Sequence, residues 1–206
     1  MARGQQQPER GFILRNVPNC LTAVTVSCGF ILMISVTLGV DSRYCVAAVM
    51  TGLVTDVLDG VAARMLDVKS PFGAAFDQLA DLTCFGIGPG VFFATTQLQR
   101  LTDWNNETPG IKPRQYWTLF AGFCYVLASV VRISRALIVH NGSRPTHFVG
   151  IPTNLAAFIL VPTVGFFPRA RALPWLVLAL SFLMVSTFRI PKGLGIIDTE
   201  KKKYSD

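Results

Sequence analysis

Four aspartates lie in one short stretch, Asp56 to Asp81, of an otherwise apolar chain; the stretch reads DVLDGVAARMLDVKSPFGAAFDQLAD. Asp56, Asp59 and Gly60 share one helix face, and Asp77 and Asp81 share a face of a second helix, because residues three or four apart are helical neighbours. Carboxylates that converge in a low-dielectric setting repel one another and therefore need cations. Oxygen ligands favour hard ions, so the stretch predicts a site for two Mg²⁺ or Mn²⁺ ions that supports phosphoryl transfer.

The four carboxylates can be given different tasks in such a transfer. Phosphoryl transfer requires that the charge of the phosphates be neutralised and that a hydroxyl nucleophile lose its proton. We expect Asp56, Asp59 and Asp77 to hold the metal ions. Asp81 lies one helical turn deeper and is expected to act as a metal ligand, as the catalytic base, or as both. Arg64 is available to bind a phosphate oxygen.

The elements that must carry these residues are membrane helices. Of the 206 residues, 51% are hydrophobic and 15% are charged, and the mean hydropathy is +0.45, which is typical of an integral membrane protein. Apolar runs near the ~20 residues that cross a bilayer recur along the chain. They are expected at residues 19–40, 44–64, 71–98, 115–139, 150–167 and 172–190. The predicted fold is an all-α, single-domain bundle of six transmembrane helices over 1–206, with an N-terminal cytosolic or interfacial segment (1–17) and a C-terminal basic tail (192–206).

The basic residues indicate an orientation rather than a nucleic-acid partner. The formal net charge is +7, yet Lys and Arg are scattered at the ends of apolar segments and form no basic helix face. In a six-helix topology, 13 of the 19 Lys and Arg residues lie on the side of the two termini. The positive-inside rule therefore places both termini and the aspartate stretch at the cytosolic face.

The aspartate stretch resembles a known family at every fixed position of that family's signature. The pattern DxxDGxxARx8Gx3Dx3D of the CDP-alcohol phosphotransferases is matched by Asp56, Asp59, Gly60, Ala63, Arg64, Gly73, Asp77 and Asp81. The resemblance implies a six-helix membrane enzyme, usually a homodimer, in which an alcohol displaces CMP from a CDP-linked substrate. It also implies that Asp56, Asp59 and Asp77 are metal ligands and that Asp81 is the base that helps to complete the metal site.

The same resemblance indicates a substrate site beside the metals. Gly60, Arg64 and Ser70 match positions that contact the CDP diphosphate in related enzymes, and Gly73 is expected with them. Ser70 also precedes Pro71 and would cap a helix whatever it binds.

Weaker similarities concern the acceptor alcohol. The segment SPFGAAFDQLADLTCFGIGPG resembles the third helix of the CDP-diacylglycerol serine O-phosphatidyltransferases, as do VPNCLT, VVRISRALIV, FVGIPTNLAA and LMVSTFRIP elsewhere in the chain. That branch usually has a small residue where Gln78 stands. The resemblance implies CDP-diacylglycerol and L-serine as substrates. The alternatives are myo-inositol or inositol phosphate and glycerol 3-phosphate.

Two arginines of the fourth expected helix are further candidates. Arg132 and Arg135 are three residues apart and lie near the expected cytosolic face. An unpaired arginine at membrane depth is costly, so we expect one of them to bind the acceptor carboxylate or a substrate phosphate. The alternative for each is a purely topological, snorkelling arginine.

Other classes of function fit the sequence less well. A cation transporter would also have intramembrane carboxylates, but spread along the membrane depth and accompanied by broken, repeated helices. Here the carboxylates gather toward one end of the bundle. A non-catalytic scaffold has no need of four clustered carboxylates.

Overall fold

The structure is a computed structural model that describes residues 8–35, 37–68, 70–103, 113–140, 147–186 and 189–191. Its helices are α1 (Pro8–Ser35), α2 (Ser42–Met65), α3 (Pro71–Asp81), η1 (Leu82–Ile87), α4 (Gly88–Asp103), α5 (Pro113–His140), α6 (Thr153–Phe166) and α7 (Leu173–Val185). Two short strands, β1 (His147–Val149) and β2 (Arg189–Pro191), pair antiparallel. α3, η1 and α4 follow one another without a break, so each of the six expected apolar segments contains one continuous helical stretch.

Four of these helical segments are long and apolar enough to cross a membrane. They are Asn16–Ser35, Ser42–Met65, Pro71–Leu101 and Pro113–Leu137. The chain is therefore a multi-pass membrane protein. The two remaining apolar helices, α6 and α7, have 14 and 13 residues. At 1.5 Å per residue they are only about 20 Å long, shorter than the ~30 Å hydrocarbon core.

Four predicted helix boundaries are wrong. The first helix ends at Ser35 instead of residue 40, and α4 ends at Asp103 instead of residue 98. The first helix begins at Pro8, so Pro18 lies inside it and residues 8–17 are not a separate segment. The helix continues past Pro18 although a proline has no N–H to donate. The last helix ends at Val185 instead of continuing to residue 190, because the chain turns there into β2. Residues 1–7 and 192–206 of the expected terminal segments lie outside the described residues.

A π-helical stretch, η1, lies just before Pro89. Within it the N–H of Gly88 donates to the carbonyl of Thr83, five residues earlier. Pro89 has no N–H, so the carbonyl of Phe85, four residues before it, lacks its usual α-helical donor. The Tyr125 hydroxyl of α5 donates to this Phe85 carbonyl at 3.0 Å. A tertiary hydrogen bond thus replaces one that the proline removes.

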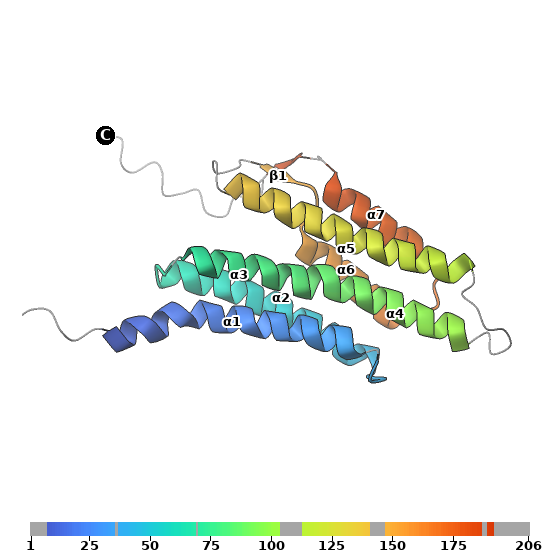
Figure 1. The fold of residues 1–206 in the computed structure, drawn as a ribbon, viewed down its shortest axis with the longest axis horizontal. Coiled ribbons are helices and arrows are strands. Elements are labelled where there is room, and N and C mark those ends of the chain that lie inside the picture. The colour runs from blue at the N-terminus through green and yellow to red at the C-terminus, as the bar shows by residue number, and fades with distance from the viewer. Residues whose placement is uncertain are drawn as a thin grey trace, which may run out of the picture.

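The long helices run side by side along the molecule (Figure 1). α1 packs mainly against α2, α5 against α7 and α4, and α6 against α2 and α4. One close crossing joins α1, α2 and η1 at Cys84: a Cβ on Gly29 would lie 2.7 Å from the Cα of Cys84, and one on Gly52 2.6 Å from its Sγ. Small residues allow such close approach between membrane helices. α3 continues directly into η1 and packs against α1, so this crossing also positions α3.

Candidate functional site

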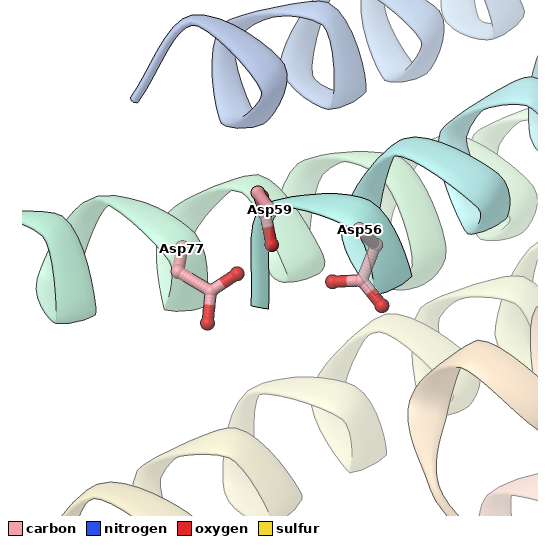
Figure 2. A group of neighbouring side chains, drawn as sticks. All are labelled: Asp56, Asp59 and Asp77. Atoms are coloured by element: carbon pink, nitrogen blue, oxygen red, sulfur yellow. The ribbon is translucent and has the colours of Figure 1, made fainter. Parts of the chain in front are cut away.

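Three carboxylates from two helices meet at one end of the bundle. Asp56 and Asp59 come from the last turns of α2, and Asp77 comes from α3; Figure 2 shows the three side chains together. One oxygen from each can be chosen so that all lie within 4.8 Å of one another. The helical spacing predicted this convergence, and it is confirmed for these three residues.

Asp81, the fourth predicted carboxylate, lies next to this group without belonging to it. Its side chain hydrogen-bonds with that of Asp56, and it interacts electrostatically with Asp77 and Arg132. Its Oδ1 is buried and has no hydrogen-bond partner. A buried carboxylate oxygen without a partner is costly. Asp81 therefore has an oxygen free to accept a proton or a cation.

A cavity of about 200 Å³ opens beside Asp59 and Asp77, between α1, α2 and α3. Three predicted substrate residues line it: Gly60, Ser70 and Gly73. The predicted Arg64 is exposed and does not line this cavity; its Nε donates to the carbonyl of Gly60 at 2.8 Å. The guanidinium is thus held beside the cavity wall, with its terminal nitrogens available.

Local sequence explains the cavity wall at the start of α3. The hydroxyl of Ser70 accepts a hydrogen bond from the N–H of Gly73 at 2.9 Å, so Ser70 is the N-cap of the helix and Pro71 its first residue. A Cβ at Gly73 would lie 3.1 Å from the Ser70 Oγ and 3.2 Å from the Oδ1 of Asn19. The glycine therefore lets α3 approach α1 closely at the cavity.

The two arginines of α5 have different surroundings. Arg132 donates from Nη1 to the hydroxyl of Thr153 at 3.2 Å and interacts electrostatically with Asp81. Arg135 is exposed and donates to the carbonyl of Val185, the last residue of α7, at 2.7 Å. A cation at a helix C-terminus is a favourable structural pairing. The structure thus brings Arg132, and not Arg135, to the carboxylates.

Two residues that sequence reasoning did not single out hold the carboxylates in place. The hydroxyl of Thr22 on α1 donates to Asp59 Oδ2 at 2.7 Å, and the amide of Asn154 on α6 donates to Asp56 Oδ2 at 2.7 Å. Both lie in segments noted only for their resemblance to a family, VPNCLT and FVGIPTNLAA. A polar residue inside an apolar run was the signal that could have identified them.

The donor set fits a divalent cation. Among the described residues, the one salt bridge joins Arg43 and Asp41, away from the site, so no arginine or lysine nitrogen pairs there with Asp56, Asp59 or Asp77. Their described hydrogen-bond donors, Thr22 and Asn154, are neutral. Neutral donors leave no basic side chain to compete with a cation for the carboxylate oxygens, and hard oxygen ligands suit Mg²⁺ or Mn²⁺. The group can therefore hold a metal ion.

Comparison with known proteins defines the class. The family model described as CDP-alcohol phosphatidyltransferase matches residues 15–187, and the chain belongs to this family. A protein of Helicobacter pylori (strain J99) named CDP-diacylglycerol--serine O-phosphatidyltransferase is 28% identical over 187 residues, covering 84% of this chain and 71% of that protein. A Bacillus subtilis (strain 168) protein of the same name is 27% identical over 175 residues, covering 85% and 89%.

A third relative extends the similarity to a longer protein. The Mycobacterium bovis protein, also named CDP-diacylglycerol--serine O-phosphatidyltransferase, is 26% identical over 163 residues, which cover 77% of this chain and 52% of that protein. The family and these relatives identify the chain as a phosphatidyltransferase enzyme.

Proposed function

We propose that the protein transfers a phosphatidyl group from CDP-diacylglycerol to the hydroxyl of L-serine, forming phosphatidylserine and releasing CMP. The observation that carries this proposal is the group of three carboxylates beside a cavity in a membrane helix bundle. The names of the relatives favour serine as the acceptor.

The reaction is proposed to depend on two divalent cations, Mg²⁺ or Mn²⁺. Asp56, Asp59 and Asp77 would hold them, and Asp81 would complete the set. When bound, such ions neutralise the diphosphate and stabilise the leaving phosphate. The hydrogen-bond donors from Thr22 and Asn154 are neutral, so they do not compete with a cation for Asp59 and Asp56.

The cavity is the proposed site for the CDP diphosphate. Gly60 and Gly73 line it, and the open space beside Gly60 lets a phosphate approach the helix backbone there. Ser70 lines the cavity, and the exposed guanidinium of Arg64 can reach a phosphate oxygen at its rim.

Asp81 is the proposed base. The serine hydroxyl attacks the phosphorus next to the lipid, the bond from that phosphorus to CMP breaks, and the hydroxyl proton passes to Asp81. Its buried, unpartnered Oδ1 supports this role. Asp81→Asn is expected to abolish turnover with a smaller loss of CDP-lipid binding than Asp56→Asn. Near-normal turnover of Asp81→Asn would exclude the role.

Arg132 is the stronger candidate for binding the acceptor carboxylate, because it lies next to Asp81. Arg135, which is exposed, is proposed to assist Arg132 from the edge of the acceptor site. Arg132→Gln and Arg135→Gln are both expected to raise the KM for serine, Arg132→Gln the more. An unchanged KM in both variants would remove the arginines from the acceptor site.

The proposed setting is a single-domain, six-span membrane bundle over residues 1–206 that acts as a homodimer. The site and both termini face the cytosol. This orientation rests on the distribution of Lys and Arg along the sequence. Labelling of single cysteines placed in the loops of sealed vesicles would test it.

The test of the function is CMP release by the purified protein with CDP-diacylglycerol and Mn²⁺ or Mg²⁺. L-Serine, myo-inositol, inositol phosphate, glycerol 3-phosphate and no acceptor are compared. Release that depends on serine is expected. Release with another alcohol would keep the transfer chemistry and discard serine. No metal-dependent release with any acceptor, together with cation flux across liposomes, would replace the enzyme with a transporter.

A further inference from the structure

The start of α6 contacts the carboxylate group. Asn154, in the first turn of α6, donates from Nδ2 to Asp56 Oδ2 at 2.7 Å, across a sequence separation of 98 residues. The contact is partly buried. A side-chain amide in such a position has a defined orientation, because its NH₂ must face the carboxylate.

The segment that presents Asn154 is held at several points. The N–H of Ile151 donates to the carbonyl of Leu183 at 3.2 Å, which ties the approach to α6 to α7. Thr153 is fully buried and accepts a hydrogen bond from Arg132. The amide of Asn154 is therefore presented to Asp56 by a fixed support.

The chemical type of the donor matters. A lysine or arginine at this position would neutralise Asp56 and compete with a cation. A neutral amide instead fixes the carboxylate while its negative charge remains. From α1, the hydroxyl of Thr22 likewise donates to Asp59 at 2.7 Å. Hydrogen-bond partners of ligating carboxylates orient the ligands and tune metal affinity.

We infer that Asn154 is a positioning residue that orients Asp56 for divalent cation binding. This inference rests on the proposed cation site. It predicts that loss of the amide weakens cation binding while the substrate cavity, which Asn154 does not line, remains intact.

The test measures Mn²⁺ binding to the purified full chain without lipid substrate, by the electron paramagnetic resonance signal of free Mn²⁺. Asn154→Leu keeps a similar size and removes the donor, and Asn154→Ala adds no bulk. Both are expected to bind Mn²⁺ about 10- to 100-fold more weakly. CMP release should recover at saturating Mn²⁺, with an unchanged KM for CDP-diacylglycerol.

Gln97→Met is the matched control. The Gln97 amide also donates between segments, to the carbonyl of Pro168 at 2.9 Å, but not to a carboxylate. This variant should bind Mn²⁺ as the wild type does.

Wild-type Mn²⁺ affinity in Asn154→Leu or Asn154→Ala would overturn the inference. Unfolding of both variants in the absence of metal would also overturn it, in favour of a packing role. If the wild type binds Mn²⁺ and the variants bind it more weakly, but no CMP is released, the inference holds and the proposed function fails.

Discussion

Glycine has opposite uses at two places on α2. At Gly52, where α2 crosses η1, a Cβ would lie 2.6 Å from the Sγ of Cys84. At Gly60, two turns closer to the cavity, the nearest atom to such a Cβ is a terminal nitrogen of Arg64 at 4.0 Å. The first glycine brings helices into contact, and the second leaves space. The helices are thus tightly packed at the crossing near Cys84. At the carboxylate end of α2, by contrast, there is open space lined by polar groups.

The largest effect on activity is expected from removing one carboxylate charge at the end of α2 or in α3. Asp56→Asn, Asp59→Asn and Asp77→Asn should each lower metal-dependent CMP release by about a thousandfold, because bound cations contribute several kcal/mol to the transition state. Folding should be retained, since removing one of several repelling carboxylates leaves the packed crossing unchanged. Turnover is compared with thermal unfolding in detergent. Variants that lose stability and activity together would contradict the separation of the two regions.

Adding a methyl group should distinguish the two kinds of glycine. A Cβ at Gly29 would lie 2.7 Å from the backbone of Cys84, so Gly29→Ala should lower the free energy of unfolding by about 1–3 kcal/mol. Gly60→Ala has room and should leave the stability unchanged, while it raises the KM for CDP-diacylglycerol. Denaturant unfolding and kinetics of both variants check this. Equal destabilisation by both would show that the cavity wall is packed as tightly as the crossing.

Neighbouring threonines of α1 allow a finer test. Thr22→Val removes the hydrogen bond to Asp59 and should weaken Mn²⁺ binding about tenfold. The control is Thr25→Val: Thr25 bonds with the hydroxyl of Thr55 at 2.7 Å, also between α1 and α2 and also buried. It should leave Mn²⁺ binding unchanged. The same loss in both would mean that helix packing, rather than the donor to Asp59, sets the affinity.

The smallest effect is expected from a buried hydrogen bond between α5 and η1. Tyr125→Phe removes the donor to the Phe85 carbonyl and should cost about 1 kcal/mol of stability, since hydrogen bonds between membrane helices contribute little. CMP release should be unchanged at a temperature where the variant is folded. A large loss of activity without a loss of stability would connect the π-helical stretch directly to the reaction.

The meeting of Asp56, Asp59 and Asp77 could be predicted because it depends on local helical spacing and one short loop. The start of α1 could not, because Pro18 is a usual helix-start signal and only the surrounding bundle allows the helix to continue through it. Asn154 was missed because its contact with Asp56 depends on how α6 packs against α2. The different partners of Arg132 and Arg135 could not be predicted for the same reason. They depend on where α6 begins and where α7 ends in the folded bundle.

Residues Pro71 to Asp103 form one continuous helical segment whose two halves have different tasks. Its first half carries Asp77 and Asp81, and its second packs against α5. The π-helical stretch between them holds extra residues per turn, and each residue of an α-helix turns the chain by about 100°. Inserting or deleting one residue in Leu82–Ile87 would therefore rotate α3 about its axis relative to α4. With α4 packed in place, the length of this stretch sets the direction in which Asp77 and Asp81 point.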